Sequence, residues 1–271
     1  MRLWLNDKDN LSSTNYALST HQHTKHYPNI MTSKERNFEG ILFDWDMTLA
    51  RAMGDVPRSQ RLTALFNRGG FLCTHEAVQQ AMAEHQEFAN KEIPLPSHTT
   101  PQTQIDIVAY YQQLLAILGF PGVSQEEALV IYHDYAYLPT DLYDDVLPTL
   151  KSLYEQEIQM GIISNHTQEA RTMMQTYVGD FIPASHIFIS DEIGLYKPLP
   201  VVFLQAAKHL NLPPEQCVYV GDNLQIDAIG AVEKGGFGLG LWLDRKNALA
   251  PGELPQHVIR ITTLTEVLDY L

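Results

Sequence analysis

The stretch Gly40-Ile41-Leu42-Phe43-Asp44-Trp45-Asp46-Met47-Thr48 indicates the fold, because a short apolar run ends there in two nearby carboxylates. An apolar run of this length, bounded by turn-forming residues, is typical of a buried strand. In an open parallel sheet, ligands bind beyond the carboxyl ends of the strands. The stretch therefore predicts a buried strand that carries a polar site at its end.

Further apolar runs alternate with helical patterns along the rest of the chain. Strands are expected at residues 160–163, 186–189, 217–220, 237–243 and 258–261, and a short helix at the C-terminus through Glu266 and Leu268. Helical patterns at 167–177 and 201–210 supply the crossovers that a parallel sheet requires. The sequence predicts an α/β fold with a doubly wound, mostly parallel, Rossmann-like sheet.

One interval, between the first two of these strands, contains no convincing strand pattern. It has apolar residues at helical spacing in four segments, 58–67, 74–88, 102–118 and 124–135, separated by Gly and Pro breakers. A helix near 146–155 then returns the chain to the sheet. We predict an α/β core from 39–52 and 142–271 with a helical subdomain at 53–141, which suits a length of 271 residues.

Residues 1–38 are polar and without periodicity, and we predict a loosely ordered N-terminal tail. The tail lacks the apolar core of a signal peptide, and Asp7 and Asp9 disfavour a transit peptide. Met31 is an alternative start. The tail also holds a histidine cluster, which lacks the preorganised geometry of a metal site: His21, His23 and His26.

The composition excludes several classes of partner. A net charge of -14, from 18 basic and 32 acidic residues, opposes attraction to a nucleic acid, although a local cation can still bind a small phosphate ester. No apolar run is long enough to span a bilayer. Cys73 and Cys217 form no disulfide or zinc pattern, which favours a reducing, cytoplasmic setting. The composition leaves a small phosphorylated substrate possible, and we expect no nucleic acid or membrane partner and a monomer or small homo-oligomer.

Polar residues follow the predicted strands where the strands end. They are Asp44, Asp46 and Thr48; Ser164 and Asn165; Lys197 in a loop before a helix; and Asp222, Asn223 and Asp227. Two carboxylates in one small space need a cation, and Mg²⁺ prefers oxygen ligands. Asp44, the backbone carbonyl of Asp46, and Asp222 would form a partial Mg²⁺ shell, and Asp227 is a further candidate metal ligand.

These residue types suit the transfer of a phosphoryl group. A carboxylate such as Asp44 can attack phosphorus and form an acyl-phosphate, while Asp46 acts as the general acid and then the general base. Lys197 would supply a fixed positive charge. The Ser164 hydroxyl and adjacent backbone N–H groups, including that of Asn165, would bind phosphate. Thr48 is expected to secure the Asp46 turn and to belong to the phosphate-binding set.

In this order, the segments resemble the four motifs of the haloacid dehalogenase superfamily from about residue 40 to the C-terminus. The first motif matches Asp44, Asp46 and Thr48, the second Ser164, the third Lys197, and the fourth Asp222 and Asp227. The helical insert resembles the cap of the branch that contains phosphoglycolate phosphatases and β-phosphoglucomutases. The resemblance implies a Mg²⁺-dependent phosphomonoester hydrolase with an aspartyl-phosphate intermediate, whose cap closes over the site and selects the substrate.

The chain departs from the family pattern at three positions of these motifs. Met47 stands where the family usually has Gly, so the turn must accommodate a side chain. Trp45 between the aspartates could alter access to the site or the hinge of the cap. Asn223 stands where a second Asp or a small residue is common, which leaves the division of metal ligation between Asp222 and Asp227 open.

Other functions fit parts of the pattern. A phosphomutase would use the same aspartates, and a receiver-like or non-catalytic phosphate-binding module could share the fold. A dehalogenase is disfavoured by Asp46, and a phosphonatase for a similar reason. The polar residues also have structural interpretations: a solvated strand end for Asp44 and Asp46, a surface position for Lys197, and helix caps for Ser164-Asn165 and Asp227.

Charged and aromatic residues near the first motif are less specific signals. Arg51, Arg58 and Arg61 are candidates to contact a substrate anion, and exposed surface positions are the alternative interpretation. The tyrosines of the helical insert have helical spacing and are expected in its core: Tyr110, Tyr111, Tyr132, Tyr135 and Tyr137.

Overall fold

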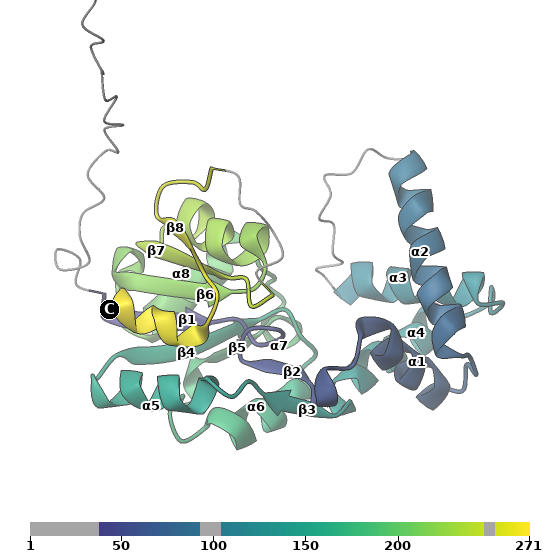
Figure 1. The fold of residues 1–271 in the computed structure, drawn as a ribbon, viewed down its shortest axis with the longest axis horizontal. Helices are drawn as coiled ribbons and strands as arrows, with labels where there is room; N and C mark the ends of the chain where they lie inside the picture. Colours follow the sequence, from purple (N-terminus) through teal and green to yellow (C-terminus); the bar gives the residue numbers. More distant parts are fainter. Residues whose placement is uncertain (1–37, 93–103, 247–252) are drawn as a thin grey trace, which may run out of the picture.

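A six-stranded parallel sheet forms the centre of the molecule in the computed structural model, which describes residues 38–92, 104–246 and 253–271 (Figure 1). The strand order is β5-β4-β1-β6-β7-β8, and every neighbouring pair is parallel. The strands are β1 (Gly40–Phe43), β4 (Gln159–Ser164), β5 (Ile187–Ile189), β6 (Cys217–Gly221), β7 (Leu239–Leu243) and β8 (Val258–Ile261). The predicted α/β fold is confirmed. The predicted tail, up to residue 37, lies outside the described residues.

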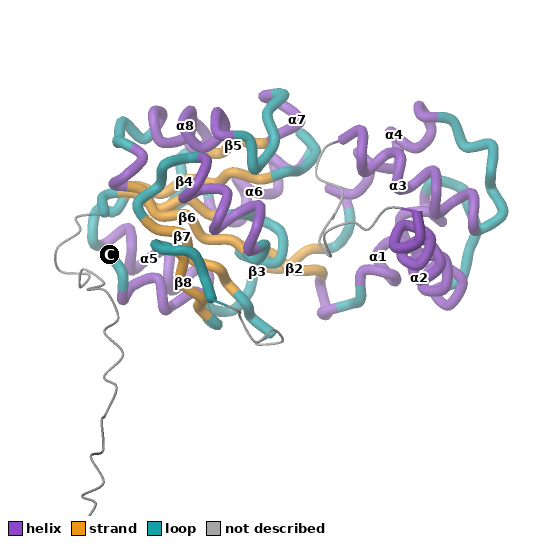
Figure 2. The backbone as a smooth tube through the Cα atoms, turned by 90° about the horizontal axis from the view of Figure 1, so that it is seen from above, coloured by secondary structure: helices purple, strands orange, loops and turns teal. Residues whose placement is uncertain are grey.

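Helices cover both faces of the sheet (Figure 2). Successive side chains of a strand point to opposite faces, so the apolar side chains of β1 are buried on both faces. Ile41 and Phe43 pack in one apolar cluster with α5 (Val146–Glu155) and α6 (Ala170–Val178). Leu42 packs on the opposite face with α8 (Pro200–His209). β1 is thus buried on both faces in the middle of the sheet, and its carboxyl end is held on a rigid support.

Several short or irregular elements were not predicted. They include α7 (Ser190–Ile193), a π-helical segment at Leu224–Lys234, and 3-10 turns at Met53–Asp55, Tyr135–Tyr137, Ala184–His186 and Pro214–Gln216. The short helix predicted at the C-terminus is present as a 3-10 helix at Leu264–Asp269. Asn223 caps the π-helical segment, because its side chain accepts hydrogen bonds from the N–H groups of Gln225 and Ile226. Asp227 lies inside that segment, so its alternative interpretation as a helix cap is wrong. None of the helices in the described ranges is both long and apolar enough to cross a bilayer.

The interval between β1 and β4 begins and ends in two short antiparallel strands, β2 (Ala50–Ala52) and β3 (Thr140–Leu142). The expectation that this interval has no strand is therefore wrong at its two ends. Three residues are too few to show a period of two, which is why the sequence pattern gave no signal. The pair carries the chain from the core to the helical insert and back (Figure 2).

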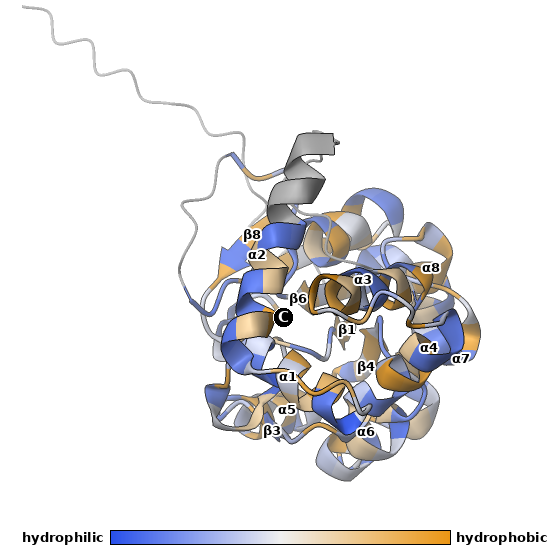
Figure 3. Cartoon of the chain, turned by 90° about the vertical axis from the view of Figure 1, so that its right-hand side faces the viewer, coloured by the Kyte–Doolittle hydropathy of each residue, from blue (hydrophilic) through white to orange (hydrophobic). Residues whose placement is uncertain are grey.

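A separate group of four helices lies beyond β2 and β3, and we call it the helical unit (Figure 1). It consists of α1 (Arg58–Arg68), α2 (His75–Glu92), α3 (Gln104–Ile117) and α4 (Gln125–Asp134). The unit has its own apolar core, in which Phe66 and Leu114 are fully buried. The apolar residues of α3 lie between α2 and α4 (Figure 3). His133 of α4 contacts the α/β core, with its Nδ1 2.9 Å from Glu169 Oε2.

The turn after β1 aims the first motif away from the sheet. The carbonyl of Trp45 accepts hydrogen bonds from the N–H groups of Leu49 (3.0 Å) and Ala50 (2.8 Å). Trp45 itself is fully buried in the core beneath β1, so it does not narrow the approach to the site. Met47 has a φ of 61°, in the left-handed region that favours glycine. The turn accommodates its side chain at the cost of backbone strain.

Met47→Gly should therefore stabilise the protein by up to about 1 kcal/mol relative to Met47→Ala. A left-handed conformation costs a residue with a Cβ roughly 1–2 kcal/mol, and the extra entropy of an unfolded glycine offsets about 0.5–1 kcal/mol of that gain. Both variants lose the contact of Met47 Sδ with the Tyr143 hydroxyl, so alanine is a matched control. Urea unfolding measures the difference. A glycine variant less stable than the alanine variant would contradict the strain argument.

Candidate active site

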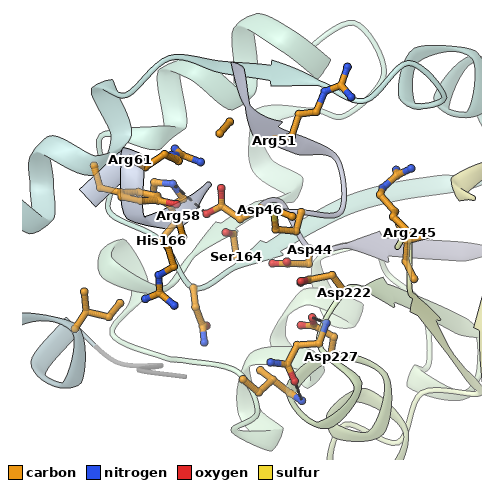
Figure 4. Close-up of a pocket in the computed structure, with 18 of the residues that line it drawn as sticks. Asp44, Asp46, Arg51, Arg58, Arg61, Ser164, His166, Asp222, Asp227 and Arg245 are labelled. Carbon is orange, nitrogen blue, oxygen red and sulfur yellow. Dashed lines mark hydrogen bonds and ion pairs between the residues drawn. The ribbon is translucent and has the colours of Figure 1, made fainter. Parts of the chain in front are cut away.

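The carboxyl ends of β1, β4 and β6 meet at one edge of the sheet, and the polar residues that follow them line a single cavity (Figure 4). The cavity has a volume of about 880 Å³ and extends from the sheet edge to the helical unit. Asp44, Ser164 and Asp222 line it from the core, together with Asp46, Asn165, Lys197 and Asp227. Seven of the eight predicted site residues are thus brought together, and Thr48 does not line the cavity.

Lys197 is the centre of the polar network. Its ammonium group donates to Asp44 Oδ1 at 2.6 Å, to Asp227 Oδ1 at 2.7 Å and to the Tyr219 hydroxyl at 2.8 Å. Tyr219 in turn donates to the carbonyl of Ile163 at 2.8 Å. A lysine has three N–H donors, so all of them are used by protein groups. Lys197 can therefore act on a substrate mainly through its charge.

The position of Lys197 is fixed by Asn165. The side-chain oxygen of Asn165 accepts from the Lys197 N–H at 2.8 Å, and its amide nitrogen donates to the Lys197 carbonyl at 2.9 Å. The Lys197-Pro198 peptide bond is cis. The side chain of Asn165 thus joins the end of β4 to the loop before α8, and the predicted contact with phosphate is left to its backbone N–H.

Burial raises the pKa of two aspartates, and the carboxylates beside them add to the shift. Burial raises the pKa of Asp44 to about 7, with Lys197 opposing the shift and Asp227 adding to it. Asp222 is exposed to the cavity, yet the protein atoms packed around it, and then the charges of Asp44 and Asp227, raise its pKa well above its usual value. Burial alone would lower the pKa of Lys197, but the two carboxylates beside it outweigh burial and hold that pKa well above its ordinary value.

These carboxylates fit a divalent cation. Oxygens of Asp44, Asp222 and Asp227 lie within 4.8 Å of one another, and hard divalent cations take such oxygen ligands. Asp227 is 1% exposed and is already held by Lys197 and by the N–H of Asn223 at 3.0 Å. Its carboxylate approaches the backbone closely because residue 221 is glycine; a Cβ there would lie 2.4 Å from it. Asp44 and Asp222 are therefore the more accessible pair.

Asp46 lies on the opposite side of Asp44 from Asp222 and Asp227, next to His166 (Figure 4). The Nδ1 of His166 accepts a hydrogen bond from the N–H of Thr167 at 2.7 Å, so the proton of a neutral ring is on Nε2. That atom lies 3.6 Å from Asp46 Oδ2. Burial lowers the pKa of His166, opposed by the charge of Asp46, which favours the neutral ring.

The predicted role of Thr48 in securing the turn is carried by its backbone. Its hydroxyl is buried without a hydrogen-bond partner among the described residues. Its carbonyl accepts from Arg245 at 2.8 Å, and Arg245 also forms a bidentate ion pair with Asp145, at 2.8 and 3.0 Å. This arrangement ties the turn after β1 to the start of α5.

Three residues of the site were not predicted from the sequence. Tyr219 could have been found as a polar residue in the otherwise apolar segment 217–220, and His166 because it directly follows Ser164-Asn165. Arg245 follows the end of β7, where the strand-end rule could have found it.

The α/β sheet and its acidic strand ends are those of a known family of enzymes. Residues 38–235 match the family of haloacid dehalogenase-like hydrolases. The chain belongs to this family and is a hydrolase.

Individual relatives carry different names. The glyceraldehyde 3-phosphate phosphatase of Methanopyrus kandleri is 36% identical over 108 residues, which are 40% of this chain and 46% of that protein, so the match spans less than half of its length. The (S)-2-haloacid dehalogenase 2 of a Pseudomonas species is 30% identical over 72% of this chain and 90% of that protein. Among solved structures, a HAD phosphatase from Thermococcus onnurineus superposes with a TM-score of 0.55 at 22% identity, covering 84% and 95% of the two chains, which supports the fold.

The carboxylate cluster predicts a pH-dependent effect of cations on stability. The pKa of Asp44 is about 7 in the folded protein against 3.8 ordinarily. The folded state therefore holds a proton that the unfolded state has lost, and the cation-free protein should lose stability as the pH rises from about 4 through 7. Asp222 acts in the same direction.

A bound divalent cation should offset this loss. Mg²⁺ at a fixed concentration, about 100 times its dissociation constant at pH 8, should raise the melting temperature by about 5–10 °C at pH 8. The same concentration should raise it much less at pH 5, where protons compete for the carboxylates, as measured by differential scanning fluorimetry. Asp222→Asn is the control, and it should remove most of the increment while making the cation-free protein less sensitive to pH. An equal rise in melting temperature at both pH values would contradict a cation site at these carboxylates.

Proposed function

We propose that the protein is a Mg²⁺-dependent phosphomonoesterase that acts on a small phosphorylated metabolite through an aspartyl-phosphate at Asp44. The observation that carries this proposal is the contact of Lys197 with Asp44 and Asp227 beside the carboxylate of Asp222. A buried carboxylate that is held by a cation and opens onto a cavity suits a nucleophile.

The first step would be an attack of Asp44 on phosphorus. Lys197 contacts Oδ1, which leaves Oδ2 as the attacking atom. As the bond from Oδ2 to phosphorus forms, the ester P–O bond breaks, and the leaving oxygen takes the proton of the Asp46 carboxyl group. Lys197 offsets charge at the nucleophile, and the Ser164 hydroxyl and neighbouring N–H groups bind the phosphoryl oxygens.

In the second step, Asp46 would remove a proton from a water molecule that attacks the phosphorus. The P–Oδ2 bond then breaks, which releases inorganic phosphate and restores the Asp44 carboxylate. His166 would orient Asp46 for both transfers, because its Nε2 proton lies toward that carboxylate. When bound between Asp44 and Asp222, Mg²⁺ would neutralise charge on the phosphoryl group.

We further propose that the helical unit is a cap, and that a reducing, cytoplasmic setting suits the protein. Residues of the unit line the same cavity as Asp44, among them Leu62, Ile107 and Tyr132. A unit joined to the core by two three-residue strands could close over a bound substrate and exclude water.

A dehalogenase is the second candidate, because a relative with that name is 30% identical over most of its length. Such an enzyme would also use a carboxylate nucleophile. The pair of Asp46 and His166, placed to move a proton, favours the phosphatase. Release of halide from 2-chloropropionate, with no release of phosphate from any ester, would select the dehalogenase instead.

Asp44→Asn should lower phosphate release from p-nitrophenyl phosphate by about 10³-fold or more, because an amide oxygen is a poor nucleophile.

Asp46→Asn should lower turnover by about 10²–10⁴-fold, the usual contribution of a general acid and base. It should also accumulate phosphorylated protein, because nitrophenolate leaves without a proton whereas the attacking water needs a base. Phosphate assays and intact mass spectrometry with Mg²⁺, and with EDTA as the control, measure both effects. Undiminished activity of Asp44→Asn would overturn the proposal.

A further inference from the structure

The helix α1 carries three arginines, each of which lies over the ring of a tyrosine. Arg58 lies 5.3 Å from the ring centre of Tyr110, Arg61 lies 4.6 Å from that of Tyr135, and Arg68 lies 5.7 Å from that of Tyr137. The arginines differ in their charge partners. Arg68 is paired with Asp134 at 3.0 Å, whereas Arg58 and Arg61 have no carboxylate partner within 4.0 Å among the described residues.

The two arginines without carboxylate partners are also the two that line the cavity. They are three residues apart in α1, so their side chains leave the helix on the same face. The Nε of Arg61 is buried and has no hydrogen-bond partner in the described part of the chain. A buried donor without a partner is costly, and a bound acceptor would satisfy it. In a chain with 32 acidic residues, two guanidinium groups left without carboxylates beside a cavity point to an anion from outside.

A series of contacts places these arginines on the side of the cavity where the leaving group would depart. Arg61 lies over Tyr135, the ring of Tyr135 lies 5.5 Å from that of His166, and His166 Nε2 lies 3.6 Å from Asp46. Asp222 and Asp227 lie on the other side of Asp44, away from Arg58 and Arg61 (Figure 4). The reacting phosphoryl group and these two arginines would thus contact different ends of the substrate.

We propose that Arg58 and Arg61 form a second anion-binding subsite, so that the preferred substrates are phosphate monoesters with a further negatively charged group, a carboxylate or a second phosphate, in the leaving alcohol. The inference rests on the proposed phosphatase function. Guanidinium groups bind both kinds of oxyanion through paired N–H donors, and stacking on Tyr110 and Tyr135 holds their planes in place.

Two matched pairs of substrates test the subsite and separate the two kinds of anion. The first pair is 3-phosphoglycerate and glycerol 3-phosphate, which differ by a carboxylate in place of a hydroxymethyl group. The second pair is propane-1,3-diol bisphosphate and 3-hydroxypropyl phosphate. The full-length protein with Mg²⁺ should hydrolyse the charged member of at least one pair with a kcat/KM at least about 10-fold above that of its neutral partner, mainly through a lower KM. The pair with the larger ratio identifies the anion.

Arg61→Met and Arg58→Met should each lower this ratio by about 10-fold, and Arg61→Lys should restore part of it. Arg68→Met is the matched control, because it removes the same charge from the same helix and from above another tyrosine, outside the cavity. It should leave the ratio unchanged. Equal kcat/KM values for the charged and the neutral substrate in both pairs would overturn the subsite. An equal loss of kcat/KM for the charged and the neutral substrate in Arg61→Met would overturn it as well.

Hydrolysis of p-nitrophenyl phosphate distinguishes the two failures. If this ester is hydrolysed in an Asp44-dependent manner but the paired substrates show no preference, the subsite alone is wrong. If no ester is hydrolysed, the phosphatase function fails, and the subsite that rests on it fails as well.

Discussion

The ammonium group of Lys197, buried between Asp44 and Asp227, constrains the rest of the site. A buried cation is tolerated only when it is paired and its donors are satisfied, and here the acceptors come from the residue after β1, from β6 and from the helical segment after β6. The strand order makes this possible, because β1 and β6 are neighbours. Gly221 permits the close approach of Asp227. The placement of the candidate nucleophile and that of Asp227 therefore depend on one buried cation.

The turn after β1, where the chain leaves the core for the helical unit, is held by contacts within the core. Arg245 holds the carbonyl of Thr48 and the carboxylate of Asp145, so the turn after β1 is tied to α5 of the core. Asp44 is further held by Lys197 and by the pairing of its N–H with the carbonyl of Val220 at 2.8 Å. None of these contacts involves α1–α4. A change in the position of the helical unit can thus alter the cavity without moving the nucleophile.

The sequence predicted the long elements well, because burial on both faces produces apolar runs such as Cys217–Gly221, and surface helices produce regular spacing such as Val146–Glu155. It could not predict the pairing of β2 with β3, which depends on contacts between residues far apart in the chain. Strand ends identified Asp44, Ser164 and Asp222 as neighbours. That rule gives the location of a side chain but not its partners, so the hydrogen bonds from Asn165 to Lys197, and the buried hydroxyl of Thr48, followed only from the structure.

An acidic protein can bind an anionic substrate here because charge is arranged locally. The side chains that line the cavity include six cations against six carboxylates, and these are Arg51, Arg58, Arg61, Lys197, Arg245 and Lys246 against Asp44, Asp46, Asp55, Asp222, Asp227 and Asp244. Fully ionised, this lining has no net charge, and one divalent cation would make it positive. Binding of the cation and of an anionic substrate should therefore be coupled, each increasing the affinity for the other. A substrate with two anionic groups would gain more from that coupling than one with a neutral leaving alcohol, because both of its ends would lie in the same positive field.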